Sequence, residues 1–195
     1  MGRPRKFDCD AVLEGAVDLF RERGFDGVSI PDLTEQLGIC RQSLYSNYGD
    51  KRGLYLAALD RYGQREVDVK LAVLEQDGSP LANVHEVLDC FESYGADCPN
   101  AGCLTGTALV EARQDERTLE VAGAHIRRLE QGFRETLERA QTAGELKPEA
   151  SPERLARALI TTCQGIGLLV RLPDGGDRIR DAVSVLREVL DGSTR

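Results

Sequence analysis

The chain is poor in several residue types that mark particular protein classes. Its 195 residues include only two histidines, one methionine and no tryptophan. Two isolated histidines without a CxxC pair are a poor ligand set, so we expect no metal site. The most apolar region, residues 155–172, is interrupted by Arg157 and Gln164 and lacks the roughly 18 continuous apolar residues of a membrane-spanning helix. No apolar stretch follows the basic N-terminus, so we expect no secretory signal and a cytoplasmic protein whose cysteines are thiols.

Common phosphate-binding and hydrolase motifs are also missing. The sequence contains no GxxxxGK, GxGxxG or GxSxG pattern. Cys103 and His125 are conceivable as a nucleophile and its base, but no spacing rule pairs them. We therefore expect no enzymatic activity and no cofactor, and a thiol-dependent enzyme is the less favoured alternative.

The pattern of apolar residues and breaks predicts an all-α fold. Apolar residues recur at helical spacing, and no alternating apolar segment is long enough for a sheet. Breaks rich in glycine or proline fall at 98–102, 144–151 and 173–176. Besides two short helices between residues 29 and 48, the expected helices span about 9–23, 50–75, 80–96, 104–114, 116–143, 152–172 and 177–190.

The segment from Ser29 to Lys51 has the pattern of two short helices joined by a tight turn. Ser29 is a good N-cap, and Asp32 completes an acidic variant of the capping box. Gly38 follows about two turns later, where a left-handed residue ends a helix. A second helix is expected over 41–48, and such a pair is typical of a helix-turn-helix that reads DNA.

The second of these helices has a polar outer face. Leu44 and Tyr48 lie four residues apart and face inward, so Gln42 and Ser46 face outward and are flanked by Ser43 and Tyr45. Gln can bond adenine in two places in the major groove. The alternative is an ordinary helical hairpin with a solvated polar face.

Cations flank this helix on both sides. Arg41 precedes Gln42, and Lys51 follows the break at residues 49–50, so both are expected to reach DNA phosphates. Further basic residues, Arg3 and Arg5, lie in an N-terminal arm that is expected either to enter the minor groove or to remain a charged tail. The net charge of -8 is unusual for a DNA-binding protein, but the first 55 residues hold eight basic residues against nine acidic ones, so the acidic excess lies mainly beyond them.

The region from Phe7 to Tyr55 resembles the N-terminal domain of TetR-family transcriptional regulators. The resemblance rests on Ala16, Leu19, Phe20, Gly24, Phe25, Ser29, Ile30, Leu37, Gly38, Ile39, Leu44, Tyr45, Tyr48, Lys51, Leu54 and Tyr55. It implies an all-helical homodimer that binds a palindromic operator, usually as a repressor released by a small ligand or a chemical signal. By matching positions it implies DNA contacts from Arg41, Gln42, Ser43, Tyr45, Asn47 and Lys51. One departure is Cys40, which stands where Ser or Thr is frequent and is expected to be a poor cap.

The sequence therefore predicts two domains. Residues 1–55 form the DNA-binding domain with its basic arm, and residues 56–195 form a helical domain for signal sensing and dimerisation. The last two helices are the expected dimer interface, because the helix over 155–172 is apolar around most of its circumference. The candidate DNA-binding residues are Arg3, Arg5, Ser29, Arg41, Gln42, Ser43, Tyr45, Ser46, Asn47 and Lys51.

Two kinds of signal remain open for the second domain. Only four of the ten aromatic residues lie beyond residue 55, which disfavours a pocket for flat aromatic drugs. A pocket for a small ligand is expected among Phe91, Tyr94, Thr107, Glu111, His125, Phe133 and Gln164. Alternatively, Cys98 and Cys103 form a redox-sensitive pair in a Pro/Gly break, with Cys40 as a further candidate thiol. Some TetR-family members resemble the chain here too, with a Gly-Cys-Leu sequence and regulation by thiol modification.

A DNA-binding regulator is thus the favoured function. A helical adaptor that does not bind DNA is the alternative from another class, and it predicts no sequence-selective binding.

Overall fold

The computed structural model describes residues 8–97, 102–113 and 115–194, with the backbone alone for residues 94–97. Within these ranges the chain forms nine helices and no strand, which confirms the expected all-α fold. The helices are α1 (Cys9–Arg23), α2 (Ile30–Gln36), α3 (Arg41–Tyr48), α4 (Lys51–Leu74), α5 (Pro80–Asp97), α6 (Leu104–Glu111), α7 (Glu116–Thr142), α8 (Pro152–Leu169) and α9 (Gly175–Gly192).

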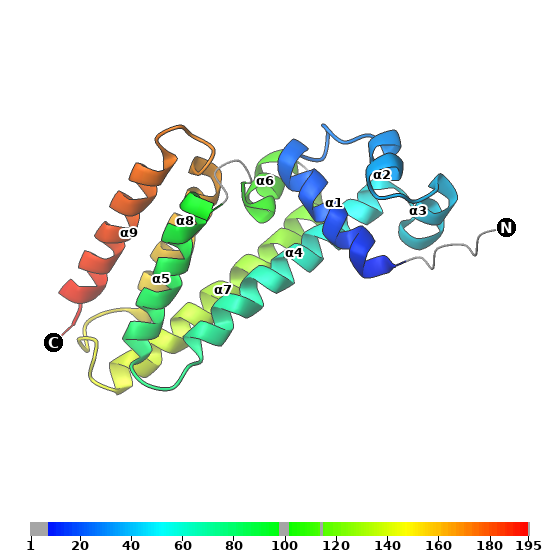
Figure 1. Cartoon of the computed structure of the whole chain (residues 1–195). Helices are drawn as coiled ribbons and strands as arrows, with labels where there is room; N and C mark the ends of the chain where they lie inside the picture. The colour runs from blue at the N-terminus through cyan, green and yellow to red at the C-terminus, as the bar shows by residue number, and fades with distance from the viewer. Residues whose placement is uncertain (1–7, 98–101, 114, 195) are drawn as a thin grey trace.

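The helices form two groups joined by two long helices. In Figure 1, α1, α2 and α3 lie at one end of the molecule, and α5, α8 and α9 lie at the other. The long helices α4 and α7 pack side by side and span the distance between the groups; α1 packs directly on α4, and the short helix α6 contacts α4, α7 and α1. A change near α5 or α8 can therefore reach the first group through α4, α6 or α7.

The first group is held by an apolar core that continues into the rest of the chain. Phe20, Leu33, Leu44 and Leu54 have no exposed surface. Burying one such leucine stabilises the folded state by about 1.5–3 kcal/mol. The same core includes Leu104 of α6, so side-chain packing crosses the boundary expected at residue 55.

A second core fills the other group. Its central side chains come from α4, α5, α7, α8 and α9, and Leu88, Phe133, Leu137 and Val183 have no exposed surface. The acidic and basic residues of these helices remain mainly on the outside, where they form ion pairs such as Arg157–Glu153 at 2.7 Å.

Most helix limits agree with the sequence expectation, and those of α1 and α3 agree at both ends. The helix expected over 104–114 ends instead at Glu111, and the backbone turns at Arg113, whose φ of 47° is incompatible with a continued helix. Helix α8 ends at Leu169 instead of residue 172, and α9 begins two residues early, at Gly175. No helix in the described part of the chain is long and apolar enough to cross a membrane.

Candidate nucleic-acid interface

The first helix of the DNA-reading pair begins with the predicted capping box. The Ser29 backbone N–H donates to Asp32 Oδ2 at 2.8 Å, and the Asp32 N–H donates to Ser29 Oγ at 3.2 Å. The Ser29 hydroxyl also donates to Asp32 Oδ2. This side-chain bond first, and the bond from the Ser29 N–H second, lower the pKa of Asp32, so the carboxylate is charged at neutral pH. At the other end Gly38 has a φ of 63°, the left-handed conformation expected there. Ser29 thus caps the start of α2, whereas Gly38 lies in the turn that leads to α3.

The second helix, α3, begins with a thiol cap. Cys40 Sγ accepts the Ser43 backbone N–H at 3.4 Å and lies 3.2 Å from Ser43 Oγ. Cys40 therefore occupies the N-cap of α3 through its thiol. Sulfur is a weak acceptor, and the expectation that this cap stabilises the helix poorly stays a prediction. The contacts with Ser43 also lower the pKa of the Cys40 thiol. Half-buried Ser43 therefore contributes to the start of the helix.

The polar face of α3 lies outward as predicted. Leu44 has no exposed surface and anchors the helix, whereas Arg41 and Gln42 are exposed and form no described side-chain hydrogen bond. Tyr45 is 49% exposed. These side chains can therefore meet a DNA major groove without breaking a described side-chain hydrogen bond.

Two further members of this face are partly engaged with their own helix. Ser46 Oγ donates to the Ser43 carbonyl at 3.2 Å, and Asn47 Nδ2 donates to the same carbonyl at 2.8 Å. Asn47 Nδ2 also donates to Ser46 Oγ at 3.4 Å. Both side chains are exposed, so the Asn47 carbonyl oxygen and one Ser46 lone pair remain able to accept hydrogen bonds.

Lys51 lies differently from the other cations. Its Nζ donates to the carbonyl oxygens of Phe25 and Val28, each at 2.8 Å, and lies 4.1 Å from the centre of the Phe25 ring. The ammonium group thus fixes the segment that joins α1 to α2. The sequence expectation had directed it outward to phosphate, and it missed this role because the two carbonyls lie more than 20 residues away. Arg3 and Arg5 of the expected arm lie outside the described residues.

Polar contacts join the α1–α3 end of the molecule and the start of α4 to later parts of the chain. Glu111 Oε2, at the end of α6, accepts the Phe25 backbone N–H at 2.9 Å. Arg52, at the start of α4, forms an ion pair with Asp115 before α7. Arg171, just after α8, donates to the carbonyl of Arg21 at 2.7 Å. The end of α6, the residue before α7 and the segment after α8 therefore contact this part of the molecule directly.

A cavity of about 60 Å³ lies between α4, α5, α6, α7 and α8, and we call it the sensor cavity. Phe91, His125 and Gln164 line it, as the sequence predicted. His125 Nε2 lies 2.9 Å from Asp60 Oδ1, and Lys70 Nζ lies 3.1 Å from Glu66 Oε2 and over the Phe91 ring. Gln164 Oε1 is buried and has no hydrogen-bond partner in the described part of the chain.

The remaining expected pocket residues do not line the sensor cavity. Phe133 lies fully inside the second apolar core, and Glu111 points to Phe25 as described. Thr107 is buried on α6, whereas Thr105 two residues earlier lines the cavity, because the helix turns successive residues by about 100°. The side chain of Tyr94 lies outside the described residues. Lys70 and Glu66 were missed because a charged pair in a helix is usually a surface pair.

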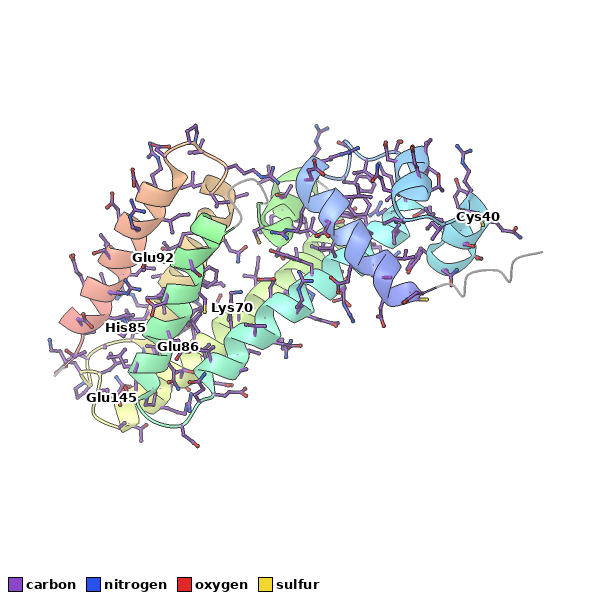
Figure 2. The ribbon with its side chains drawn as sticks, in the orientation of Figure 1. Cys40, Lys70, His85, Glu86, Glu92 and Glu145 are labelled. Carbon is purple, nitrogen blue, oxygen red and sulfur yellow. The ribbon has the colours of Figure 1, made fainter. Side chains whose placement is uncertain are left out.

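The candidate thiols lie in different surroundings. Cys103 is the N-cap of α6, where its Sγ accepts the Gly106 N–H at 3.4 Å, and it also lines the sensor cavity. Gly167 permits this approach, since a Cβ there would lie 2.5 Å from Cys103 Cβ. Cys40 is exposed at the outer end of the molecule, far from Lys70 of α4 (Figure 2). Cys98 lies outside the described residues.

Cys163 is another thiol that lines the sensor cavity. Burial raises its pKa to about 12, so this thiol is protonated at neutral pH. The described residues contain no group of three or more His, Cys, Asp or Glu side chains that could hold a metal ion. Cys103 and His125 both line the sensor cavity, but each has another partner in the structure.

The capped helix pair with its anchored, outward polar face defines a helix-turn-helix DNA-binding protein. Comparisons with known proteins agree with this class. Residues 12–58 match the family described as "Bacterial regulatory proteins, tetR family", and residues 80–186 match "Tetracyclin repressor-like, C-terminal domain".

Individual proteins resemble the chain over most of its length. An uncharacterised HTH-type transcriptional regulator, YezE of Bacillus subtilis (strain 168), is 32% identical and the match covers 98% of this chain and 100% of the relative. The HTH-type transcriptional repressor ComR of Escherichia coli (strain K12) is 33% identical over 87% of this chain and 82% of the relative. A solved structure of a cysteine mutant of the TetR-family regulator CifR, complexed with a 26-base-pair operator DNA, has a TM-score of 0.80 and 29% identity, covering 97% of this chain and 98% of that chain.

The chain belongs to the TetR family of transcriptional regulators. The resemblance inferred from residues 7–55 is thereby confirmed, and the family assignment extends to the second domain, for which the sequence offered only length and helical pattern.

Proposed function

We propose that this regulator is a dimeric, cytoplasmic repressor that binds a palindromic operator and leaves it when the second domain receives a signal. The observation that carries the DNA-binding part is the polar face of α3, which is exposed and without described side-chain hydrogen bonds at Arg41 and Gln42 while Leu44 anchors the helix. The operator-bound structure of the similar regulator CifR supports this proposal.

Gln42 is the proposed base-reading residue, with Tyr45, Ser46 and Asn47 beside it. Arg41 is proposed to bind phosphate, whereas Lys51 is proposed to act mainly by holding the segment before α2. Residues 1–55 act as the DNA-binding part in this proposal and residues 56–195 as the sensing part, although side chains from both parts pack together in the first of the two apolar cores.

Dimerisation is proposed to occur through α8 and α9. Both helices carry large apolar side chains that are 41–56% exposed, namely Leu168, Leu169, Leu172 (just after α8), Val185 and Val189. A Cβ at Gly165 of α8 would meet no atom within 4 Å, so this position is open to a neighbouring helix. Two-fold pairing would present two α3 helices to half-sites about 34 Å apart.

The signal is proposed to act at the sensor cavity, either as a small ligand or as modification of Cys103. Cys103 lines the sensor cavity and caps the start of α6, and the other end of α6 contacts Phe25 through Glu111. A ligand in the cavity and a modified Cys103 would therefore both act on α6. If Cys98 and Cys103 form a disulfide, the two thiols lose two protons and two electrons to the oxidant. Diamide accepts them at its nitrogen–nitrogen double bond and becomes the hydrazine.

Fluorescence anisotropy of the full chain on DNA flanking its own gene tests both parts. We expect tight binding that a scrambled duplex does not show. Reversible loss with diamide and recovery with dithiothreitol, absent in Cys103→Ser and retained in Cys163→Ser, would support the thiol signal. Binding that ignores diamide would remove it and leave the small ligand. Equal binding of both duplexes would contradict the proposal of a sequence-specific operator, and binding of neither duplex would favour a helical adaptor.

A further inference from the structure

A second cavity lies where the DNA-binding end meets the sensing domain, and we call it the junction cavity. It has a volume of about 260 Å³ and shares no lining residue with the sensor cavity. Its walls come from the segment between α1 and α2, from α4, from the end of α6 and the start of α7, and from the segment between these two helices. Its lining includes Phe25, Asp26, Tyr55, Glu111, Arg113 and Asp115.

The Tyr55 hydroxyl is the unusual group of this cavity. Tyr55 is only 3% exposed, and its ring packs against those of Phe20 and Phe25, each with a centroid distance of 5.0 Å. The hydroxyl oxygen is buried and has no hydrogen-bond partner among the residues that the structure describes. Buried hydroxyl groups in folded proteins nearly always have a partner, because leaving one unpaired is costly.

Two carboxylates line the same cavity as Tyr55, those of Glu111 and Asp115. Burial raises the pKa of Tyr55 first, and the charges of Glu111 and Asp115 raise it further, so the phenol is neutral. Asp115 already accepts hydrogen bonds from Thr118 and pairs with Arg52. Glu111 uses Oε2 for the Phe25 N–H, and its Oε1 accepts no described hydrogen bond. Tyr55 Oη and Glu111 Oε1 are thus two oxygen acceptors without a described partner on one cavity.

The unpaired Glu111 carboxylate of the junction cavity favours a cation. Asp26, Glu111 and Asp115 contribute three negative charges, while Arg113 in the lining, Arg52 beside Asp115 and Lys51 beside Phe25 contribute three positive ones. Arg52 is paired with Asp115 and Lys51 is bound by two backbone carbonyls, whereas Glu111 and Asp26 form no described ion pair. A group with several N–H donors can bond both free oxygen atoms at once, whereas a metal ion would need more ligands than these two.

We propose that the junction cavity binds a small alkylammonium ion, whose N–H groups donate to Tyr55 Oη and Glu111 Oε1. The cavity is smaller than the roughly 300–1,000 Å³ sites of drug-sized ligands, so the alkyl group is short and lies along the Phe25 ring. A bound ammonium links α4 to the end of α6. It therefore joins the DNA-binding end to the sensing domain at a site separate from the sensor cavity.

Nuclear magnetic resonance of the ¹⁵N-labelled full chain tests the proposal with n-butylammonium chloride as the probe. The Phe25 amide, which donates to Glu111, is the reporter. We expect a saturable shift of its resonance. Butyltrimethylammonium chloride has the same charge but no N–H donor, and at equal concentration it should produce no saturable shift. An equal response to both cations, or no saturable response to n-butylammonium, would overturn the proposal.

Variants assign the binding to the two oxygen acceptors. Tyr55→Phe removes the hydroxyl and keeps the ring, and we expect it to weaken n-butylammonium binding about tenfold or more. Glu111→Gln removes the negative charge and should weaken it similarly. Tyr45→Phe makes the same chemical change on exposed α3 and should leave binding unchanged. Unaltered binding in both Tyr55→Phe and Glu111→Gln would show that the cation binds elsewhere.

Discussion

Replacing Lys51 by methionine separates a structural role of this cation from a DNA-contacting one. Methionine keeps most of the side-chain length but cannot donate to the carbonyls of Phe25 and Val28, each now 2.8 Å from Lys51 Nζ. It also removes the positive charge 4.1 Å from the Phe25 ring centre. Two partly buried hydrogen bonds from a charged donor and one cation–π contact together stabilise the fold by about 2–4 kcal/mol.

Urea unfolding of the full chain measures this loss. We expect the free energy of unfolding to fall by about 2–4 kcal/mol in Lys51→Met. Operator binding at several salt concentrations, under conditions where the variant is folded, should show a nearly unchanged salt slope. That slope counts the phosphates neutralised by the protein.

Arg41→Met is the matched control. Arg41 lies at the other side of the recognition helix, is exposed, and forms no described side-chain hydrogen bond. Its replacement should change the unfolding free energy by less than about 0.5 kcal/mol and lower the salt slope by about one. The reasoning is refuted if Lys51→Met behaves in the way expected of Arg41→Met.

Three further predictions follow from the same structure. Gln42→Ala should lose about 1–3 kcal/mol of discrimination at one or two base pairs in anisotropy assays, whereas an equal loss on specific and random DNA would remove it as a base reader. Because Ser29 lowers the pKa of Asp32, the charged carboxylate stabilises the fold at neutral pH, and this contribution is lost as the pH falls through the lowered pKa, below 3.8. Wild type and Asp32→Asn should therefore differ in urea unfolding at pH 7 and converge in strong acid, and a constant difference would contradict this. Val185→Glu, at a 56% exposed position of α9, should shift sedimentation from dimer to monomer, and an unchanged dimer would place the interface elsewhere.

Local signals in the sequence predicted the reading helices well. The capping box of Ser29 and Asp32 and the left-handed Gly38 depend on neighbouring residues only, and the structure has both. The outward position of Gln42 follows from helical geometry once Leu44 is taken as buried. These features could be predicted because each involves residues within one or two turns of the chain.

Features that depend on distant parts of the chain could not be predicted. Lys51 contacts carbonyls 23 and 26 residues away, and Glu111 accepts an N–H from Phe25, 86 residues away. Neither residue carries a local pattern that distinguishes these contacts from solvent exposure. The early end of α6 at Glu111 is of the same kind, because it accompanies the contact with Phe25 and the turn at Arg113. The sensor cavity likewise combines five helices, so three of the six predicted pocket residues whose side chains are described line it.

Selection of bound duplexes from a random DNA pool by the purified full chain tests the central claim most directly, because the pool contains every candidate half-site and the protein alone chooses among them. The account predicts enrichment of an inverted repeat with half-sites about one helical turn apart, and a changed preference at one or two base pairs of each half-site in Gln42→Ala. Recovery of duplexes without a common sequence, or of the same sequence with unchanged preference in Gln42→Ala, would contradict the claim that the exposed face of α3 reads an operator.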